Sequence, residues 1–128
     1  MFLLAGGSAK RYYGANVSVN PLVMRYYSLE KLINLYDGYR KVFKIDDAQL
    51  MLLQLDGQHY LIESNCPHRA WPLSTSDIQG ENLVCPKHHY RFDLRSGELL
   101  HATEEPCRGL RCYEVVYRDN ELGVMLGD

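Results

Sequence analysis

The sequence lacks a long apolar stretch and lacks a strong excess of either charge. Its 128 residues include 14 Lys and Arg and 16 Asp and Glu, which give a net charge of −2. This balance does not favour nucleic acid as a partner. No apolar run approaches the roughly 20 residues of a membrane-spanning helix, and the run at residues 2–5 is too short for the core of a secretion signal. We expect a cytoplasmic protein with no membrane anchor and no nucleic-acid partner.

Cysteine is also scarce, with four residues in the chain. Cys66 and Cys85 each stand close to a histidine, whereas no neighbouring histidine at a metal-binding spacing accompanies Cys107 or Cys112. Because disulfides are rare in the cytosol, we interpret Cys107 and Cys112 as two reduced thiols. A redox pair or a second metal site is the alternative interpretation.

Two short motifs carry metal-binding chemistry. The first reads Cys-Pro-His and runs from Cys66 to His68, and the second reads Cys-Pro-Lys-His and runs from Cys85 to His88. Thiolate and imidazole are ligands that zinc, copper and iron–sulfur iron accept. The proline after each cysteine stiffens the loop and removes one backbone donor.

The four ligands fit two kinds of centre. They could hold one tetrahedral zinc ion, or a two-iron, two-sulfide cluster with both cysteines on one iron and both histidines on the other. Zinc sites usually place like ligands together, as Cys-Cys and His-His pairs. Here each motif supplies one thiol and one imidazole, so the spacing favours the iron–sulfur cluster, with a structural zinc domain as the alternative.

The stretches CPHRAWPLS, which begins at Cys66, and CPKHHYRFDLRSG, which begins at Cys85, resemble the two cluster-binding loops of Rieske [2Fe–2S] proteins. The resemblance covers roughly residues 26–126. It implies a soluble Rieske-type ferredoxin in which Cys66 and Cys85 bind one iron while His68 and His88 bind the other. His89 and Ala70 each stand at a position where the family often has glycine. Glycine there would serve a positive φ, which other residues adopt less readily.

The resemblance also bears on the reduction potential. Two thiolates cancel the net positive charge of two ferric ions and two sulfides, so the oxidised site is neutral and easier to reduce than an all-thiolate site. Such centres span about −150 to +300 mV. High-potential Rieske proteins carry two further cysteines and a serine that donates to a sulfide, and those positions here hold Trp71, Lys87 and Tyr90. We therefore expect a potential at the low end of the range.

Short strands separated by turn signals predict an all-β fold. We expect a Rieske-like antiparallel sandwich or barrel over residues 26–128, with an inserted cluster-binding subdomain at about 64–97 and an N-terminal extension at 1–25 that could be flexible. Asp56-Gly57 predicts a tight hairpin turn. The expected strands are residues 40–45, 49–55, 58–63, 82–84, 90–93, 110–118 and 121–126.

One short helix is expected near the N-terminus. Ser28 is a good N-cap residue. Four apolar residues lie on one face at helical spacing, namely Leu29, Leu32, Ile33 and Tyr36. Gly38 would end this helix of about two turns in a left-handed conformation.

The family resemblance implies a one-electron carrier. It would accept an electron from a flavoprotein reductase and pass it to an oxygenase or another terminal enzyme. An alternative is a tightly bound small subunit of a reductase, like that of nitrite reductase. We expect no enzyme activity of its own, because no nucleophile–base pair is visible and the remaining histidines do not form a two-His, one-carboxylate iron site. Those histidines are His59, His89 and His101.

Several residues beside the motifs invite an interpretation. The imidazoles of His68 and His88 should point to solvent as the exit for electrons. Trp71 could cover the cluster or pack in the core, and Asp93 should fix the turn at residues 96–97. A basic rim could steer an acidic partner, although an ordinary solvated mixture of charges is the simpler interpretation. Its members would be Arg69, Lys87, His89, Arg91 and Arg95.

Overall fold

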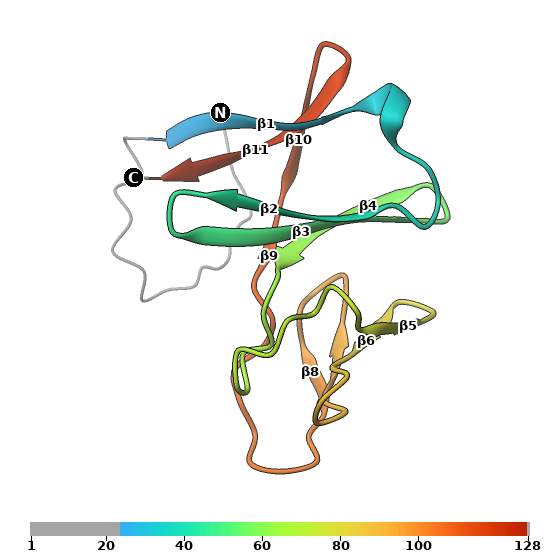
Figure 1. Ribbon diagram of the computed structural model, residues 1–128, viewed down its shortest axis with the longest axis vertical. Coiled ribbons are helices and arrows are strands. Elements are labelled where there is room, and N and C mark those ends of the chain that lie inside the picture. The colour runs from blue at the N-terminus through green and yellow to red at the C-terminus, as the bar shows by residue number, and fades with distance from the viewer. Residues whose placement is uncertain (1–23, 128) are drawn as a thin grey trace.

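The computed structural model describes residues 24–127, which form three antiparallel sheets (Figure 1). The predicted all-β class is confirmed. The first sheet has the order β1-β11-β10, the second β2-β3-β4-β9 and the third β5-β6-β7-β8. The strands are β1 (Met24–Lys31), β2 (Arg40–Ile45), β3 (Ala48–Leu55), β4 (Gln58–Glu63), β5 (Asp77–Gln79), β6 (Asn82–Val84), β7 (Arg91–Asp93), β8 (Leu99–His101), β9 (Cys112–Tyr113), β10 (Val115–Arg118) and β11 (Glu121–Gly127).

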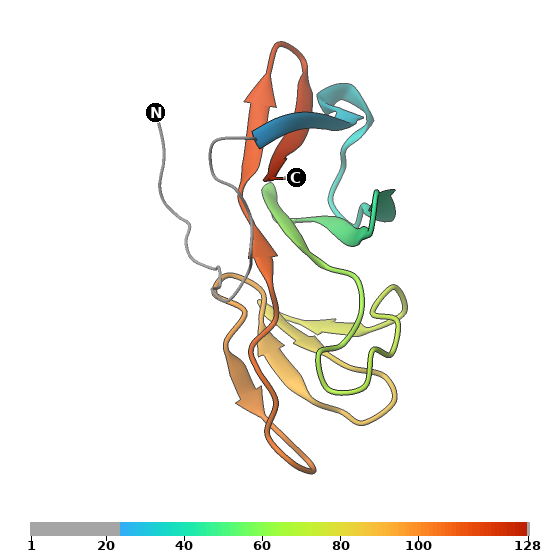
Figure 2. The same cartoon turned by 90° about the vertical axis from the view of Figure 1, so that its left-hand side faces the viewer.

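The second sheet is the middle layer, and β3 shows why. Leu50 and Leu52 belong to one buried cluster, together with Leu122 of β11. Met51 and Leu53 belong to another, which includes residues of the third sheet. Side chains alternate between the faces of a strand, so a strand with both faces covered reads as a continuous apolar run. Figures 1 and 2 show the middle sheet between the other two.

Tight turns place these strands in register. Asp56 and Gly57 have φ values of 49° and 76°. Two positive φ values in a two-residue turn match the right-handed twist of the paired strands. The predicted hairpin is confirmed, with Leu55 opposite Gln58. Asp46, between β2 and β3, and Asp119, between β10 and β11, also have positive φ.

The strand expected over residues 110–118 is interrupted, and the interruption joins two sheets. Glu114 lies between β9, which pairs with β4 in the middle sheet, and β10, which pairs with β11 in the first sheet. β5 and β8 complete the third sheet, and the sequence did not predict them as strands.

The prediction of a two-turn helix after Ser28 is wrong. The segment Met24–Lys31 forms β1, and Leu32–Asn34 form a single turn of 3-10 helix. β1 pairs with β11 along its length, and this long-range pairing outweighs a weak local helical pattern. Ile33 is 89% exposed, so the expected apolar stripe is not a core face. Gly38 does take a positive φ, of 97°.

Residues 1–23, most of the predicted N-terminal extension, lie outside the described residues. Within residues 24–127, no helix is long and apolar enough to cross a membrane. The chain leaves the middle sheet at Glu63 and re-enters it at Cys112. We propose that residues 64–111 form one inserted subdomain, which includes the segment expected at about 64–97. It lies at the end of the molecule opposite β1 (Figure 2).

Candidate metal centre

The first motif lies in a loop closed by two backbone hydrogen bonds. The amide of Cys66 donates to the carbonyl of Trp71 at 2.8 Å, and the amide of Ala70 donates to the carbonyl of Cys66 at 2.6 Å. Ala70 has a φ of 57°, in the left-handed region. The predicted need for a positive φ at this position is confirmed.

The second motif repeats the same backbone arrangement. The amide of Cys85 donates to the carbonyl of Tyr90 at 2.8 Å, and the amide of His89 donates to the carbonyl of Cys85 at 2.9 Å. His89 has a φ of 62°, so the second predicted positive φ is also confirmed. Each loop thus bends back on its own cysteine, and the two cysteines have equivalent places.

Both cysteine side chains are buried, with exposures of 1% for Cys66 and 0% for Cys85. Burial, with a smaller contribution from the adjacent Cys85 thiol, raises the pKa of the Cys66 thiol to about 12. The backbone amides of His68 and Arg69 act against this rise because they donate to the Cys66 sulfur. The buried Cys66 sulfur is therefore a poor thiolate by itself, and a bound metal would have to displace its proton.

The imidazoles of the two motifs lie next to each other. The ring centroids of His68 and His88 are 4.9 Å apart, with the ring planes at 89°. The Nδ1 atom of each ring is buried and has no hydrogen-bond partner among the described residues. An unsatisfied buried nitrogen is destabilising, and two of them, in the same loops as two buried cysteines, provide a donor set suited to metal coordination. The residues present therefore fit a metal cluster held through Nδ1.

The ring of Tyr90 packs against the imidazole of His68. Its ring is fully buried and stacks on the ring of His68, with centroids 4.1 Å apart and planes 12° apart. Its hydroxyl donates to the backbone carbonyl of Glu105. From the sequence, position 90 was notable only because it lacks the serine of high-potential Rieske proteins. The structure shows a buried aromatic ring there that packs on His68.

Glu104 covers the outer edge of the site, and sequence reasoning missed it. Its Oε1 lies 3.3 Å from Nε2 of His68 and 3.6 Å from Nη2 of Arg69. The His68 side chain is consequently only 8% exposed. The expectation that both imidazoles point freely to solvent therefore fails for His68. The sequence carries no signal for Glu104, since the loop after β8 has no motif.

The expected basic rim is mostly engaged in local contacts. Arg95 lies 3.0 Å from Glu81, and Arg91 donates to Gln79 at 3.0 Å. Lys87 lies over the ring of Trp71, with its Nζ 5.1 Å from the ring centroid. Trp71 is 40% exposed, so it is not a core residue.

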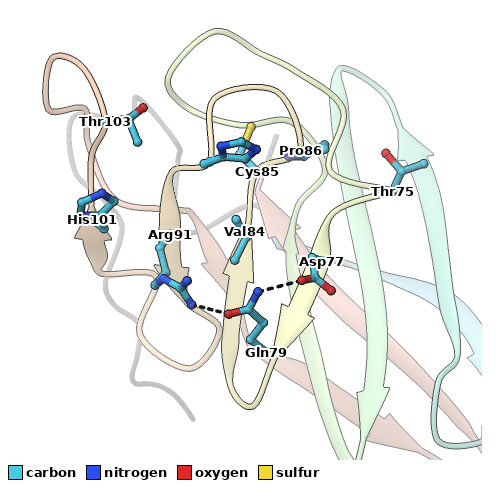
Figure 3. Close-up of a pocket in the computed structure, with 10 residues that line it drawn as sticks. Thr75, Asp77, Gln79, Val84, Cys85, Pro86, Arg91, His101 and Thr103 are labelled. Atoms are coloured by element: carbon cyan, nitrogen blue, oxygen red, sulfur yellow. Dashed lines mark hydrogen bonds between the residues drawn. The ribbon is translucent and has the colours of Figure 1, made fainter.

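A groove of about 500 Å³ flanks the second loop. Figure 3 shows Arg91 and Gln79 linked across its floor to Asp77, with Cys85 at the upper edge. His89 and His101 also line this groove. His89 is exposed at the surface, and the choice of His88 as the second histidine of the site stays a prediction.

Two further predictions concern nearby residues. Asp93 does fix its turn, because its carboxylate accepts the Ser96 hydroxyl at 2.9 Å and the Arg95 amide at 3.2 Å. Neither Cys107 nor Cys112 takes part in a disulfide. Both pack against the core of the inserted subdomain.

Known proteins share this arrangement. The family model described as "Rieske [2Fe–2S] domain" matches residues 26–114. The ferredoxin component of a naphthalene 1,2-dioxygenase/salicylate 5-hydroxylase system from Ralstonia sp is 30% identical over 57 residues, which are 44% of this chain and 55% of that protein. A 4beta-methylsterol monooxygenase of Methylococcus capsulatus is 46% identical over 37 residues, which are 29% of this chain and 10% of that protein. The chain thus spans about half the length of the first relative and a tenth of the second.

A solved structure adds a comparison of the fold. The ferredoxin of carbazole 1,9a-dioxygenase from Nocardioides aromaticivorans IC177 superimposes with a TM-score of 0.66 at 28% identity. The match covers 77% of this chain and 95% of that one. Taken with the family model and the paired loops, this places the chain in the Rieske [2Fe–2S] domain family, whose cofactor is a Rieske-type [2Fe–2S] cluster.

Proposed function

We propose that the protein is a one-electron carrier whose cluster is held by Cys66, His68, Cys85 and His88. The cysteines would bind one iron through their sulfurs, and the histidines would bind the other through Nδ1. The observation that carries this assignment is that each motif loop holds a buried cysteine and a buried Nδ1 atom that has no hydrogen-bond partner within residues 24–127. When bound, the cluster supplies one-electron oxidation and reduction.

The chain's own residues hold this centre rigidly and near the surface. Both loops are fixed by backbone hydrogen bonds, and Tyr90 fixes the ring plane of His68 by stacking. His88 is partly exposed, and we propose its imidazole as the edge that faces a redox partner. Rigid ligands favour electron transfer because little rearrangement accompanies the change of charge.

The partners follow from the relatives. Proteins named as ferredoxin components of dioxygenase systems are similar to this chain, which supports an oxygenase or another redox enzyme as acceptor and a flavoprotein reductase as donor. We propose no catalytic step for the chain itself. We also propose a cytoplasmic location, where thiols stay reduced for metal binding. The expected low potential remains a prediction.

A pair of matched histidine variants tests the ligand assignment. His88→Ala should abolish the [2Fe–2S] spectrum and lower the iron and acid-labile sulfide content of purified protein. His89→Ala should leave all three close to wild type, because Ala70 occupies the equivalent left-handed position in the first loop. Equal loss in both variants, or retention of the cluster in His88→Ala, would contradict the assignment.

Electron transfer is tested with the reconstituted protein. A flavoprotein ferredoxin reductase with its nicotinamide donor should bleach the visible absorbance of the wild-type protein, and the colour should return on addition of a dioxygenase terminal component. A protein that holds the cluster and is reduced chemically, yet exchanges electrons with neither component, would argue for the alternative of a fixed subunit in a reductase.

A further inference from the structure

Three consecutive residues of the loop after β8 contact the centre, and we refer to residues 103–105 as the cover segment. The Thr103 hydroxyl donates to the backbone carbonyl of His88 at 2.6 Å. The Glu104 carboxylate lies 3.3 Å from Nε2 of His68. The carbonyl of Glu105 accepts the Tyr90 hydroxyl. The cover segment is therefore attached to both loops, and only Glu104 brings a charge to an imidazole.

Which ring nitrogen of His68 carries the proton determines whether Glu104 can accept a hydrogen bond from that ring. If Nδ1 binds iron, the single proton of the neutral ring must be on Nε2. That N–H can donate a hydrogen bond to the Glu104 carboxylate. A protonated Nε2 cannot accept a hydrogen bond from Nε of Arg69, which lies 3.4 Å away. The guanidinium of Arg69 is instead left to pair with the carboxylate at 3.6 Å. In the loaded protein, Glu104 thus has two donors.

We propose that Glu104 is a positioning residue that orients His68 and lowers the reduction potential of the cluster. A carboxylate on the outer nitrogen fixes the ring and increases its basicity, which favours the more positive, oxidised metal. Its negative charge also opposes the arrival of an electron. Both effects act in the same direction. This inference rests on the proposed function, since it requires a cluster bound through His68.

The neighbouring residue provides a matched control. Glu105 carries the same charge one position away, and its recorded contact with the centre is through its backbone carbonyl. Glu104→Gln and Glu105→Gln change the net charge equally and alter the segment's shape little. A general effect of charge would shift the potential similarly in both variants. An effect transmitted through the contact between Glu104 and His68 would shift the potential in Glu104→Gln and leave it nearly unchanged in Glu105→Gln.

The experiment is a redox titration of the loaded wild-type protein and both variants at one pH, followed by visible absorbance and electron paramagnetic resonance. Glu104→Gln should raise the ratio of reduced to oxidised cluster at a fixed potential by about tenfold, equivalent to about 59 mV. Glu105→Gln should stay within about twofold of wild type. Equal shifts in the two variants, or a lower potential in Glu104→Gln, would overturn the proposal.

A second variant keeps the proposal testable if the first variant loses the cluster. If Glu104→Gln does not retain the cluster, Glu104→Asp keeps the charge but withdraws it by one methylene. A raised potential in Glu104→Asp supports the proposal, and an unchanged potential overturns it. Absence of a [2Fe–2S] spectrum from the wild-type protein would instead refute the proposed function, so the two failures are distinguishable.

Discussion

Glu63, the last residue of β4, anchors the loop that follows the cover segment. Its two carboxylate oxygens accept from Nη1 and Nη2 of Arg108 at 2.6 and 2.8 Å, and the amide of Arg111 donates to the same carboxylate at 2.7 Å. The Glu63 side chain is only 13% exposed, whereas that of Arg108 is 43% exposed. We predict that this pair holds residues 102–111 against the middle sheet and so keeps the cover segment in place.

The magnitude follows from these contacts. A hydrogen bond to a charged group contributes about 1.5–3 kcal/mol, but solvent screening of the exposed Arg108 reduces the ion pair to about 1 kcal/mol. Glu63→Ala also deprives the Arg111 amide of its acceptor. We therefore expect a loss of about 2 kcal/mol for Glu63→Ala and about 1 kcal/mol for Arg108→Ala, with a coupling of about 1 kcal/mol between them.

The assay is a double-mutant cycle by urea unfolding at neutral pH, with equal cluster loading in all samples. Glu114→Ala is the control, because Glu114 is exposed and has no side-chain bond recorded among residues 24–127. Glu63→Ala should also release iron to a chelator faster than the control. Additive effects of Glu63→Ala and Arg108→Ala, or a Glu63→Ala variant as stable as the control, would refute the reasoning.

Two further predictions concern strain and protonation. Ala70→Gly should increase stability by about 0.5–1 kcal/mol because glycine relieves the left-handed backbone, whereas Ala102→Gly should destabilise, and a thermal melt showing the same sign for both would refute this. Burial lowers the pKa of His59, whose ring also contacts the Tyr117 hydroxyl at 2.7 Å. The unfolded chain therefore binds more protons than the folded one between the lowered pKa of folded His59 and about 6.5, so stability should fall as the pH drops through that range. His59→Gln should reduce this loss between pH 7.5 and 5.5, and an identical loss in unfolding experiments would count against it.

The parts of the fold that sequence predicted well are those fixed by local chemistry. Asp56 and Gly57 specify their own turn, and the strands on both sides begin and end within one residue of the prediction. The motif loops were likewise predictable, because ligand types and spacing are local. Even the positive φ of Ala70 and His89 could be anticipated from the family pattern.

The parts that failed depend on contacts between distant segments. β1 is a strand because β11 pairs with it about a hundred residues later, and the helical spacing of apolar residues from Leu29 to Tyr36 could not reveal this. Glu104 reaches His68 because the chain returns over the first loop after the third sheet. No residue near Glu104 in sequence signals that contact, so only the fold identifies it.

The most direct test of the account is the metal content and spectrum of anaerobically purified protein. We predict about two iron and two acid-labile sulfide per chain, and a reduced sample whose magnetic resonance shows nitrogen coupling from two imidazoles. A colourless protein that contains zinc, lacks sulfide and cannot be reconstituted would contradict the central claim that Cys66, His68, Cys85 and His88 bind an iron–sulfur cluster.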